Sequence, residues 1–322
     1  MFTTEDGLVR NWITRIYRDS RGFLWLCTVE GVSIFDGKHF TNFTSRDGLP
    51  NRFVTDVVET SSGEHWLATV SGLARLSARH PVDLPAFTAF KLGTSDAANR
   101  IDRLVEDTKH QIWCITADGL YRFSSIATQP FHAEKVVLPE PIGTQFSDLL
   151  VDSNDRLWLL SSSSLVLRAA DGTWKKSTAV AGLLKEANTL TQDSEGRIWI
   201  GSRDSLLGIR VDESGSTQIV GRYSGLAGGG PITALIADPQ NDLWVGARLL
   251  ARFHPTTSKI AAAYQTIPVQ SVLLPLFRTD FPQIARATFG SVSGTLESPE
   301  SAAVPANYLA PKTALSYPLL SV

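Results

Sequence analysis

The stretch DSRGFLWLCT at residues 19–28 decides the fold, because related copies of it recur along the chain. Each copy joins a turn to a short apolar run that contains a tryptophan. The six tryptophans that share this context are Trp25, Trp66, Trp113, Trp158, Trp199 and Trp244. Their successive spacings of 41, 47, 45, 41 and 45 residues indicate one supersecondary unit per copy.

The pattern inside a copy predicts short strands. In the first copy the apolar run 23–26 is followed by Gly31, by a second run at 32–35, by the hairpin pair Asp36-Gly37 and by residues 40–43. Long stretches of helical periodicity are absent. Four strands per unit, repeated around an axis, are typical of a β-propeller. We therefore predict an all-β propeller with six recognisable four-stranded blades.

The repeated polar and aromatic residues are interpreted as structural. A tryptophan on the second strand of a blade can fill the gap between two twisted sheets. Six residues before it stands an acidic residue in five copies, which we expect to bond the backbone of its own hairpin. These aspartates are Asp19, Asp107, Asp152, Asp193 and Asp238, and Thr60 takes their place in the second copy. His65 and His110 occupy the same turns, and we expect them to face solvent.

The two ends of the chain leave the number of blades open. Residues 2–8 repeat the pattern of residues 43–49, so the chain opens on the end of an outer strand. Either the C-terminal residues supply the missing inner strands and close the ring, or the sequence is a fragment that begins within a blade and leaves a seven-bladed ring incomplete. Eight of the sixteen prolines lie from Pro255 onward, and no tryptophan does. We predict a propeller over residues 1–267 and a proline-rich irregular tail, or a degenerate or frame-shifted seventh blade, over residues 268–322.

The composition excludes several classes of protein. The chain has 322 residues, of which 43% are hydrophobic and 19% charged, so it can bury a large core. A formal net charge of -2 does not favour binding to nucleic acid. No apolar run is long enough for a membrane helix, and residues 1–6 show no signal peptide. Cys27 and Cys114 lie two copies apart, and we expect them to be buried thiols without a disulfide.

The motif as a whole resembles the two-component regulator propeller repeat. The resemblance is carried by Asp6-Gly7-Leu8, by the stretch 19–28 and by Phe35-Asp36-Gly37, and it extends in looser form to about residue 255. It implies a ligand-binding sensor of a bacterial signalling protein, on the periplasmic or extracellular side, with carbohydrates as frequent ligands. In such proteins a β-sandwich, a membrane helix and a kinase or cyclase module usually follow. This chain shows none of them, which favours a fragment.

Alignment of the copies on their tryptophans predicts a site at the central channel. Ten residues before the tryptophan, four consecutive copies carry Arg15, Asp56, Arg103 and Asp148, where the last two copies carry Thr189 and Ala234. These four charged side chains form either ion pairs between blades or a polar floor for a sugar or similar ligand. The loops before the inner strands carry Asn11, Arg52 and Arg100, which we place nearer the channel mouth.

Two other functions stay open beside ligand sensing. A propeller can be an interaction platform for another protein, and some propellers are enzymes, such as a lyase or a glycosidase. The sequence shows no cluster with metal-ligand spacing, no nucleophile–base signature and no phosphate-binding loop. We therefore predict no catalytic residues, no metal site and no cofactor.

Overall fold

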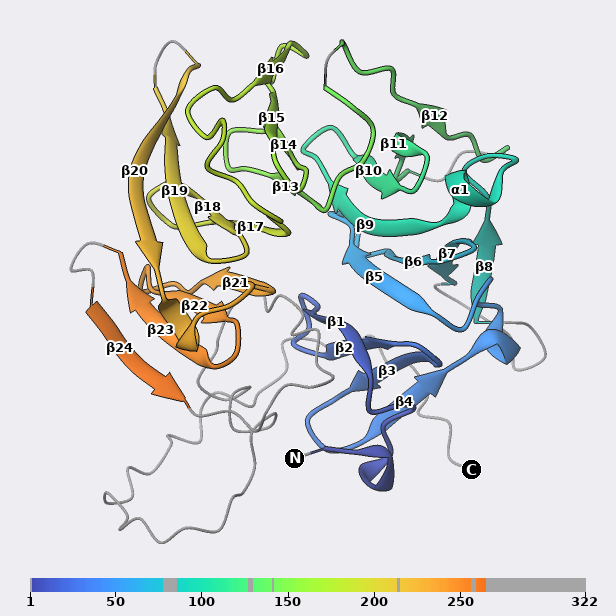
Figure 1. Ribbon diagram of the computed structural model, residues 1–322. Coiled ribbons are helices and arrows are strands. Elements are labelled where there is room, and N and C mark those ends of the chain that lie inside the picture. The colour runs from blue at the N-terminus through green and yellow to red at the C-terminus, as the bar shows by residue number, and fades with distance from the viewer. Residues whose placement is uncertain are drawn as a thin grey trace, which may run out of the picture. The chain divides into compact units, whose positions relative to one another are not determined.

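The chain folds as six antiparallel four-stranded sheets arranged around a centre (Figure 1). The computed structural model describes residues 2–77, 86–126, 130–140, 142–212, 215–255 and 259–264, all within the compact unit Met1–Phe289. In every sheet the strands follow chain order, and the first strand lies nearest the centre. The predicted propeller of four-stranded blades is confirmed. The predicted boundary at residue 267 and the tail lie outside the described residues.

The strand bounds match the predicted repeat. Blade 1 consists of β1 (Ile13–Arg18), β2 (Leu24–Thr28), β3 (Gly31–Phe35) and β4 (Phe40–Phe43). Blades 2 and 3 consist of β5 (Val54–Glu59), β6 (His65–Thr69), β7 (Gly72–Leu76), β8 (Phe87–Phe90), β9 (Ile101–Glu106), β10 (Gln111–Thr116), β11 (Gly119–Ser124) and β12 (Glu134–Lys135). Blades 4 and 5 consist of β13 (Asp148–Val151), β14 (Leu157–Leu160), β15 (Leu165–Arg168), β16 (Trp174–Lys176), β17 (Thr189–Gln192), β18 (Ile198–Gly201), β19 (Ser205–Val211) and β20 (Thr217–Ser224). Blade 6 consists of β21 (Ala234–Ala237), β22 (Leu243–Gly246), β23 (Leu250–His254) and β24 (Lys259–Tyr264).

Short helical turns join some of the blades. They are η1 (Thr4–Asp6), η2 (Ser45–Asp47), α1 (Asp96–Asn99) and η3 (Leu226–Gly228). The first two have the same capping box and end at a left-handed glycine, with φ of 102° at Gly7 and 98° at Gly48. A side chain would be strained at either glycine. The predicted equivalence of residues 2–8 and 43–49 is therefore confirmed.

Each repeat tryptophan packs against the next blade. Trp25 lies in one apolar cluster with Val54 and Leu67 of blade 2, and the same relation recurs from blade to blade. Trp244 of blade 6 shares a cluster with Leu8 and Ile16 of blade 1. Within the described residues, an apolar cluster therefore links blade 6 to blade 1. The exposed fraction is 6% for Trp244 and 0–2% for the other five, so burial of these rings accounts for much of the core.

The repeated aspartate links its hairpin to the tryptophan. One carboxylate oxygen of Asp19 accepts the N–H groups of Arg21 and Phe23, as expected for an Asx turn. The other oxygen accepts the indole N–H of Trp25 at 3.2 Å, a bond that the sequence did not reveal. The same indole–carboxylate bond occurs in blades 3 to 6 at 2.7–3.1 Å. A buried indole N–H is thereby satisfied in five blades.

Blade 2 lacks this bond. Thr60 stands in place of the aspartate, and its hydroxyl accepts the N–H of Glu64. In the described part of the chain, the Nε1 atom of Trp66 has no hydrogen-bond partner, although the ring is 1% exposed. The guanidinium of Arg75 lies over the same ring, 5.5 Å from its centroid.

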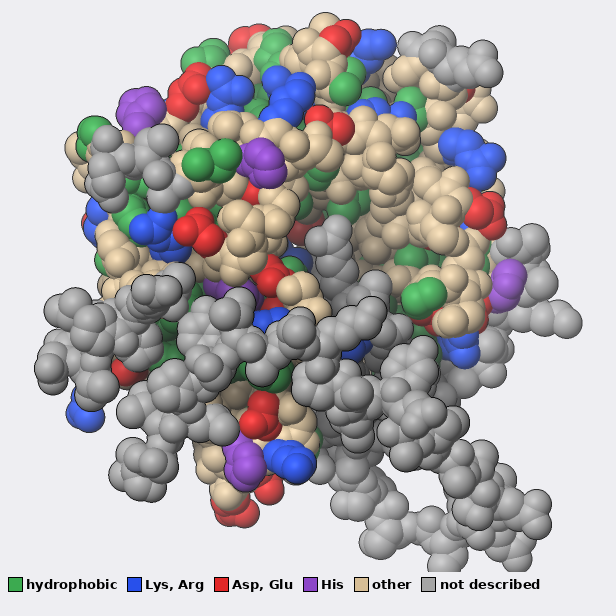
Figure 2. Space-filling model, turned by 180° about the vertical axis from the view of Figure 1, so that it is seen from behind, with side chains coloured by type: hydrophobic (Ala, Val, Ile, Leu, Met, Phe, Trp, Pro, Cys, Tyr) green, Lys and Arg blue, Asp and Glu red, His purple; other side chains and the backbone are tan. Residues whose placement is uncertain are grey.

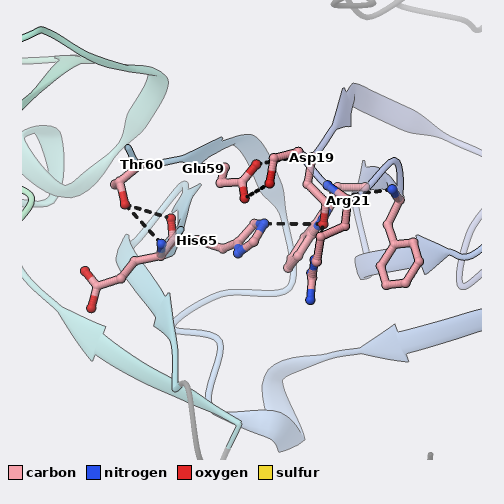
Figure 3. Close-up of polar contacts among 9 residues, drawn as sticks. Asp19, Arg21, Glu59, Thr60 and His65 are labelled. Atoms are coloured by element: carbon pink, nitrogen blue, oxygen red, sulfur yellow. Dashed lines mark hydrogen bonds and ion pairs between the residues drawn. The ribbon is translucent and has the colours of Figure 1, made fainter. Parts of the chain in front are cut away.

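His65 is buried, so the expectation that it faces solvent was wrong. Its exposed fraction is 4%, and its ring stacks on Trp25 of the preceding blade with a centroid distance of 4.4 Å. Its Nε2 atom lies 3.6 Å from Oδ2 of Asp19 (Figure 3). The turn of blade 2 thus packs against blade 1. Alignment of the sequence copies does not reveal a contact between two blades. The His110 side chain, in the corresponding turn, is 48% exposed.

Polar contacts join neighbouring blades at the end of the blade that carries the hairpin between the first and second strands. The residue after the aspartate donates its N–H to a side chain of the next blade, as Ser20 does to Glu59 at 2.6 Å (Figure 3). The donors of the next four junctions are Ser61, Thr108, Ser153 and Ser194. Between blades 6 and 1 the corresponding residues are Pro239, which has no N–H, and Arg18, which has no acceptor. This contact therefore cannot form at the junction between blades 6 and 1.

Restoring the missing acceptor of blade 2 should stabilise the protein. We expect Thr60→Asp to raise the free energy of unfolding by about 1 kcal/mol, because a buried indole N–H gains a partner. Thr60→Ala, which removes the existing bond to Glu64 and adds none, is the control and should lower it. Urea denaturation followed by circular dichroism measures both. A Thr60→Asp variant no more stable than wild type would contradict this account of Trp66.

The contribution of Asp19 to stability should depend on pH. Burial raises the pKa of its carboxyl, but His65, Arg21, the N–H of Phe23 and the indole of Trp25 together lower it well below the usual 3.8. A depressed pKa stabilises the folded state above the unfolded-state value, and this stability is lost as the pH falls below it. We expect Asp19→Asn to flatten the decline of unfolding free energy between about pH 5 and pH 2. The exposed Asp204→Asn is the control, and an equal slope in wild type and Asp19→Asn would contradict the prediction.

Candidate functional site

The inner strands present polar side chains toward one another across the blade junctions. In blades 1 to 3 the register of the inner strand shifts by one residue at Thr14, Thr55 and Asp102. Such a bulge re-aims a side chain. Thr14 and Thr55 donate their hydroxyls to the carbonyls of Val54 and Ile101 in the next blade. The next residue in each strand is one of the predicted channel residues.

The first predicted pair joins blades 1 and 2. The Nε atom of Arg15 lies 3.0 Å from Oδ1 of Asp56. The same carboxylate accepts the N–H of Val57 and, through its other oxygen, the N–H of Leu104 in blade 3 at 2.9 Å. Asp56 thus contacts both neighbouring blades.

The second pair repeats the arrangement two blades further on. The Nε atom of Arg103 lies 3.4 Å from Oδ1 of Asp148, whose other oxygen accepts the N–H of Leu190 in blade 5 at 2.8 Å. Burial raises the pKa of Asp148, and the guanidiniums of Arg103 and Arg15 oppose this rise. Burial alone would lower the pKa of Arg103, but Asp148, Asp56 and Asp102 raise it, so the guanidinium stays charged. All four predicted channel residues therefore belong to one electrostatic group.

In each ion pair the aspartate is buried and the arginine is partly exposed to solvent. The carboxylate side chains of Asp56 and Asp148 are 1% and 3% exposed, whereas the guanidinium side chains of Arg15 and Arg103 are 17% and 26% exposed. The predicted ion pairs between blades are confirmed at two junctions, Arg15–Asp56 and Arg103–Asp148. The carboxylates act within the fold, and the arginines retain N–H groups for another partner. Binding of a ligand at these residues stays a prediction.

The charged group covers only part of the ring. Blade 5 has Thr189 and blade 6 has Ala234 at the level of the arginines and aspartates. Within the described ranges, Oγ1 of Thr189 and Oδ1 of its neighbour Asn188 are buried without a hydrogen-bond partner. The charge is therefore concentrated on blades 1 to 4, and the polar groups of blade 5 were not predicted as part of the site.

The three predicted mouth residues lie on three separate loops. Asn11 accepts the N–H of Thr4 at 2.8 Å and so holds the N-terminal turn. Arg52 is 68% exposed and pairs with Glu30 of blade 1 at 2.9 Å. Arg100 is exposed at the end of α1. Burial raises the pKa of Asp102, and the charge of Arg100 opposes part of this rise. The structure does not bring these three side chains together, and a role in binding stays a prediction for each.

Charges are mixed on the face of the molecule that Figure 2 shows. In Figure 2, acidic and basic side chains alternate on the visible part of the face opposite to the view of Figure 1. No group of three or more His, Cys, Asp or Glu that could hold a metal occurs among the residues that the structure describes. In the same residues, no helix is long and apolar enough to cross a membrane.

Sequence comparison supports the repeat type. A family model for the two-component regulator propeller matches residues 7–30 and 184–204, in the first and fifth copies. The resemblance predicted from the motif is thus confirmed at these copies. No protein of curated function matches the chain.

Solved structures with the same fold include sensors and an enzyme. The extracellular domain of a putative one-component system from B. thetaiotaomicron is 19% identical with a TM-score of 0.65, over 80% of this chain and 36% of that one. The extracellular domain of a putative hybrid two-component system from the same organism is 17% identical with a TM-score of 0.65, over 81% and 35%. Virginiamycin B lyase from Staphylococcus aureus is 15% identical with a TM-score of 0.66, over 84% and 89%. This chain spans about a third of either sensor domain, and at these identities the likeness shows the fold.

Removing Asp56 should destabilise the protein more than removing its partner Arg15. Asp56→Ala leaves Arg15 and two main-chain N–H groups without their acceptor, so we expect a loss of about 3 kcal/mol in unfolding free energy. Arg15→Ala leaves the carboxylate with both N–H donors, and we expect about 1 kcal/mol. Chemical denaturation of the two variants measures the difference. Equal losses would contradict the view that the aspartate, rather than the arginine, holds the blades together.

Proposed function

We propose that this chain is the ligand-binding propeller of a bacterial sensor protein, without catalysis of its own. The observation that carries the proposal is the division of each pair into a buried carboxylate and a partly exposed guanidinium. Asp56 and Asp148 each lie beside an arginine and each accept two main-chain N–H groups. One guanidinium nitrogen of Arg103 donates to the carbonyl of Asp102, and the other N–H groups of Arg15 and Arg103 are proposed to serve a polar ligand. The family match and the two extracellular sensor domains of the same fold support it.

The ligand we propose is a carbohydrate or another small polar molecule. Guanidinium N–H groups bind hydroxyl and carboxylate oxygens, and their planar fork orients the bound group. In the full-length protein, a β-sandwich and a transmitter module would receive the signal. The propeller would then stand on the periplasmic or extracellular side of the membrane, and the two structures of the same fold from B. thetaiotaomicron are extracellular domains.

An enzymatic propeller is the second candidate, because virginiamycin B lyase shares the fold over most of both chains. Release of a reaction product from a ligand that the protein binds would distinguish an enzyme from a sensor. An interaction platform for another protein is the third, and recovery of a stoichiometric protein partner would favour it.

Arginine substitutions at the channel test the proposed site. We expect Arg15→Lys and Arg103→Lys each to weaken binding at least tenfold, because lysine keeps the charge but loses the planar fork. Isothermal titration calorimetry against a panel of oligosaccharides and sugar acids measures the affinity. Arg210→Lys on β19, whose side chain is 52% exposed, is the matched control and should bind as wild type does.

Three outcomes distinguish a wrong site, a wrong function and a wrong ligand class. Unchanged affinity in both channel variants would overturn the site but leave the sensor function standing. Binding followed by release of a cleaved product would replace the sensor with an enzyme. Wild-type protein that binds no member of the panel would contradict the proposed ligand class.

A further inference from the structure

At three junctions, one position of the inner strand joins its blade to the next through a side-chain hydroxyl. It stands eleven residues before each repeat tryptophan, and its six residues are Thr14, Thr55, Asp102, Ser147, Asn188 and Thr233. The hydroxyls of Thr14, Thr55 and Ser147 each donate to a main-chain carbonyl of the next blade at 2.5–2.8 Å. The acceptors stand twelve residues before the next repeat tryptophan and belong to Val54, Ile101 and Ala187. The three junctions therefore share one hydrogen bond between the same two positions.

Asp102 is the only carboxyl group at this position. Its main chain lies as that of Thr14 and Thr55 does, because all three are the residue at which the inner strand shifts register. The corresponding acceptor in the next blade is the carbonyl of Phe146, twelve residues before Trp158. An ionised carboxylate has no proton to donate to a carbonyl. In the part of the chain that the structure describes, the carboxylate of Asp102 makes no hydrogen bond.

The ion pair beside Asp102 is longer than its counterpart. Arg103 follows Asp102 and pairs with Asp148 across the junction of blades 3 and 4. Its counterpart at the junction of blades 1 and 2 is the pair of Arg15 and Asp56. The distance from Nε to Oδ1 is 3.0 Å where the hydroxyl bond is present and 3.4 Å where the carboxyl group stands. Within the described ranges, the Nε atom of Arg103 is buried without a hydrogen-bond partner. The missing hydroxyl bond and the longer ion pair thus occur at the same junction.

The charges around Asp102 come from its own blade and from both neighbouring blades. Burial raises the pKa of Asp102, and the guanidiniums of Arg100 and Arg103 oppose part of this rise. Arg103 in turn interacts with Asp148 of blade 4 and with Asp56 of blade 2. The two arginines are therefore shared with other carboxylates, and they do not cancel the effect of burial on Asp102. A raised pKa means that folding favours the protonated form of this carboxyl group.

We propose that Asp102 forms a proton-dependent hydrogen bond between blades 3 and 4. Its protonated carboxyl group donates to the carbonyl of Phe146, as the hydroxyls do at the other junctions, and release of the proton breaks the bond. The stability that this bond supplies is fully present below the unfolded-state pKa of 3.8 and is lost as the pH rises through the folded-state pKa. The bond also draws Arg103 toward Asp148. Its effect on ligand binding by Arg103 rests on the proposed function, whereas the bond itself needs no ligand.

Two variants that differ by one hydroxyl test the bond by urea denaturation. Asp102→Thr supplies the donor that the other junctions use, and Asp102→Val has the same shape without it. We expect the unfolding equilibrium constant of Asp102→Thr to be about fivefold smaller than that of Asp102→Val at every pH. Asp102→Thr should also be more stable than wild type at about pH 8, and this difference should shrink toward about pH 4, because wild type then gains the same bond. Asp204→Asn, which changes an exposed aspartate, is the control and should follow wild type.

NMR of the arginine Nε–H groups reports on Arg103 without a ligand, and the Arg103→Lys variant identifies its signal. We expect this hydrogen to exchange with solvent about fivefold more slowly in Asp102→Thr than in Asp102→Val. Equal stability of the two variants would overturn the hydrogen bond. A difference between wild type and Asp102→Thr that stays constant with pH would overturn its dependence on a proton, and equal exchange rates would overturn its effect on Arg103. Failure of the protein to bind any ligand of the panel would contradict the proposed ligand class while the stability results still support the bond.

Discussion

In each blade one tryptophan ring packs against the next blade, and the rest of the fold depends on this apolar contact. The indole ring is covered by the following blade, and in five of the six blades its N–H is bonded to an aspartate in the hairpin of its own blade. The aspartate in turn shapes the hairpin through main-chain N–H groups. Ring burial, hairpin geometry and blade spacing are therefore coupled in one unit. A blade cannot rotate or slip without breaking an apolar contact and a buried hydrogen bond together.

Because this unit lies outside the inner strands, the residues of the inner strands can differ from blade to blade. The six residues at the level of Arg15 include two arginines, two aspartates, a threonine and an alanine, and the fold accepts them all. Where a carboxylate is present, its neighbours on both sides satisfy it, as Arg15 and the N–H of Leu104 do for Asp56. The outer parts of each blade thus supply the scaffold, and the residues of the channel and mouth can vary without loss of the fold. The junction of blades 6 and 1 is the one at which Pro239 and Arg18 rule out the side-chain contact to a main-chain N–H.

Much of the candidate site was predictable from alignment of the copies. The spacing from the tryptophan placed Arg15, Asp56, Arg103 and Asp148 at one level, and the structure joins them in pairs across the junctions. The mouth residues Asn11, Arg52 and Arg100 were located on the correct loops but not in a shared site.

The sequence by itself determined the blade type, the six copies and the strand order, because each strand lies between turn residues that recur at fixed distances from a tryptophan. It also identified Thr60 as the exception among the aspartates. Only the tertiary structure decided which side chains meet: that His65 is buried on Trp25, that the aspartates bond the indole N–H, and that Asp56 contacts the blades on both sides. The physical reason is that spacing within one copy sets which face of its own sheet a side chain occupies. Its partners belong to a neighbouring sheet some 40 residues away, and the twist and packing of the two sheets select them.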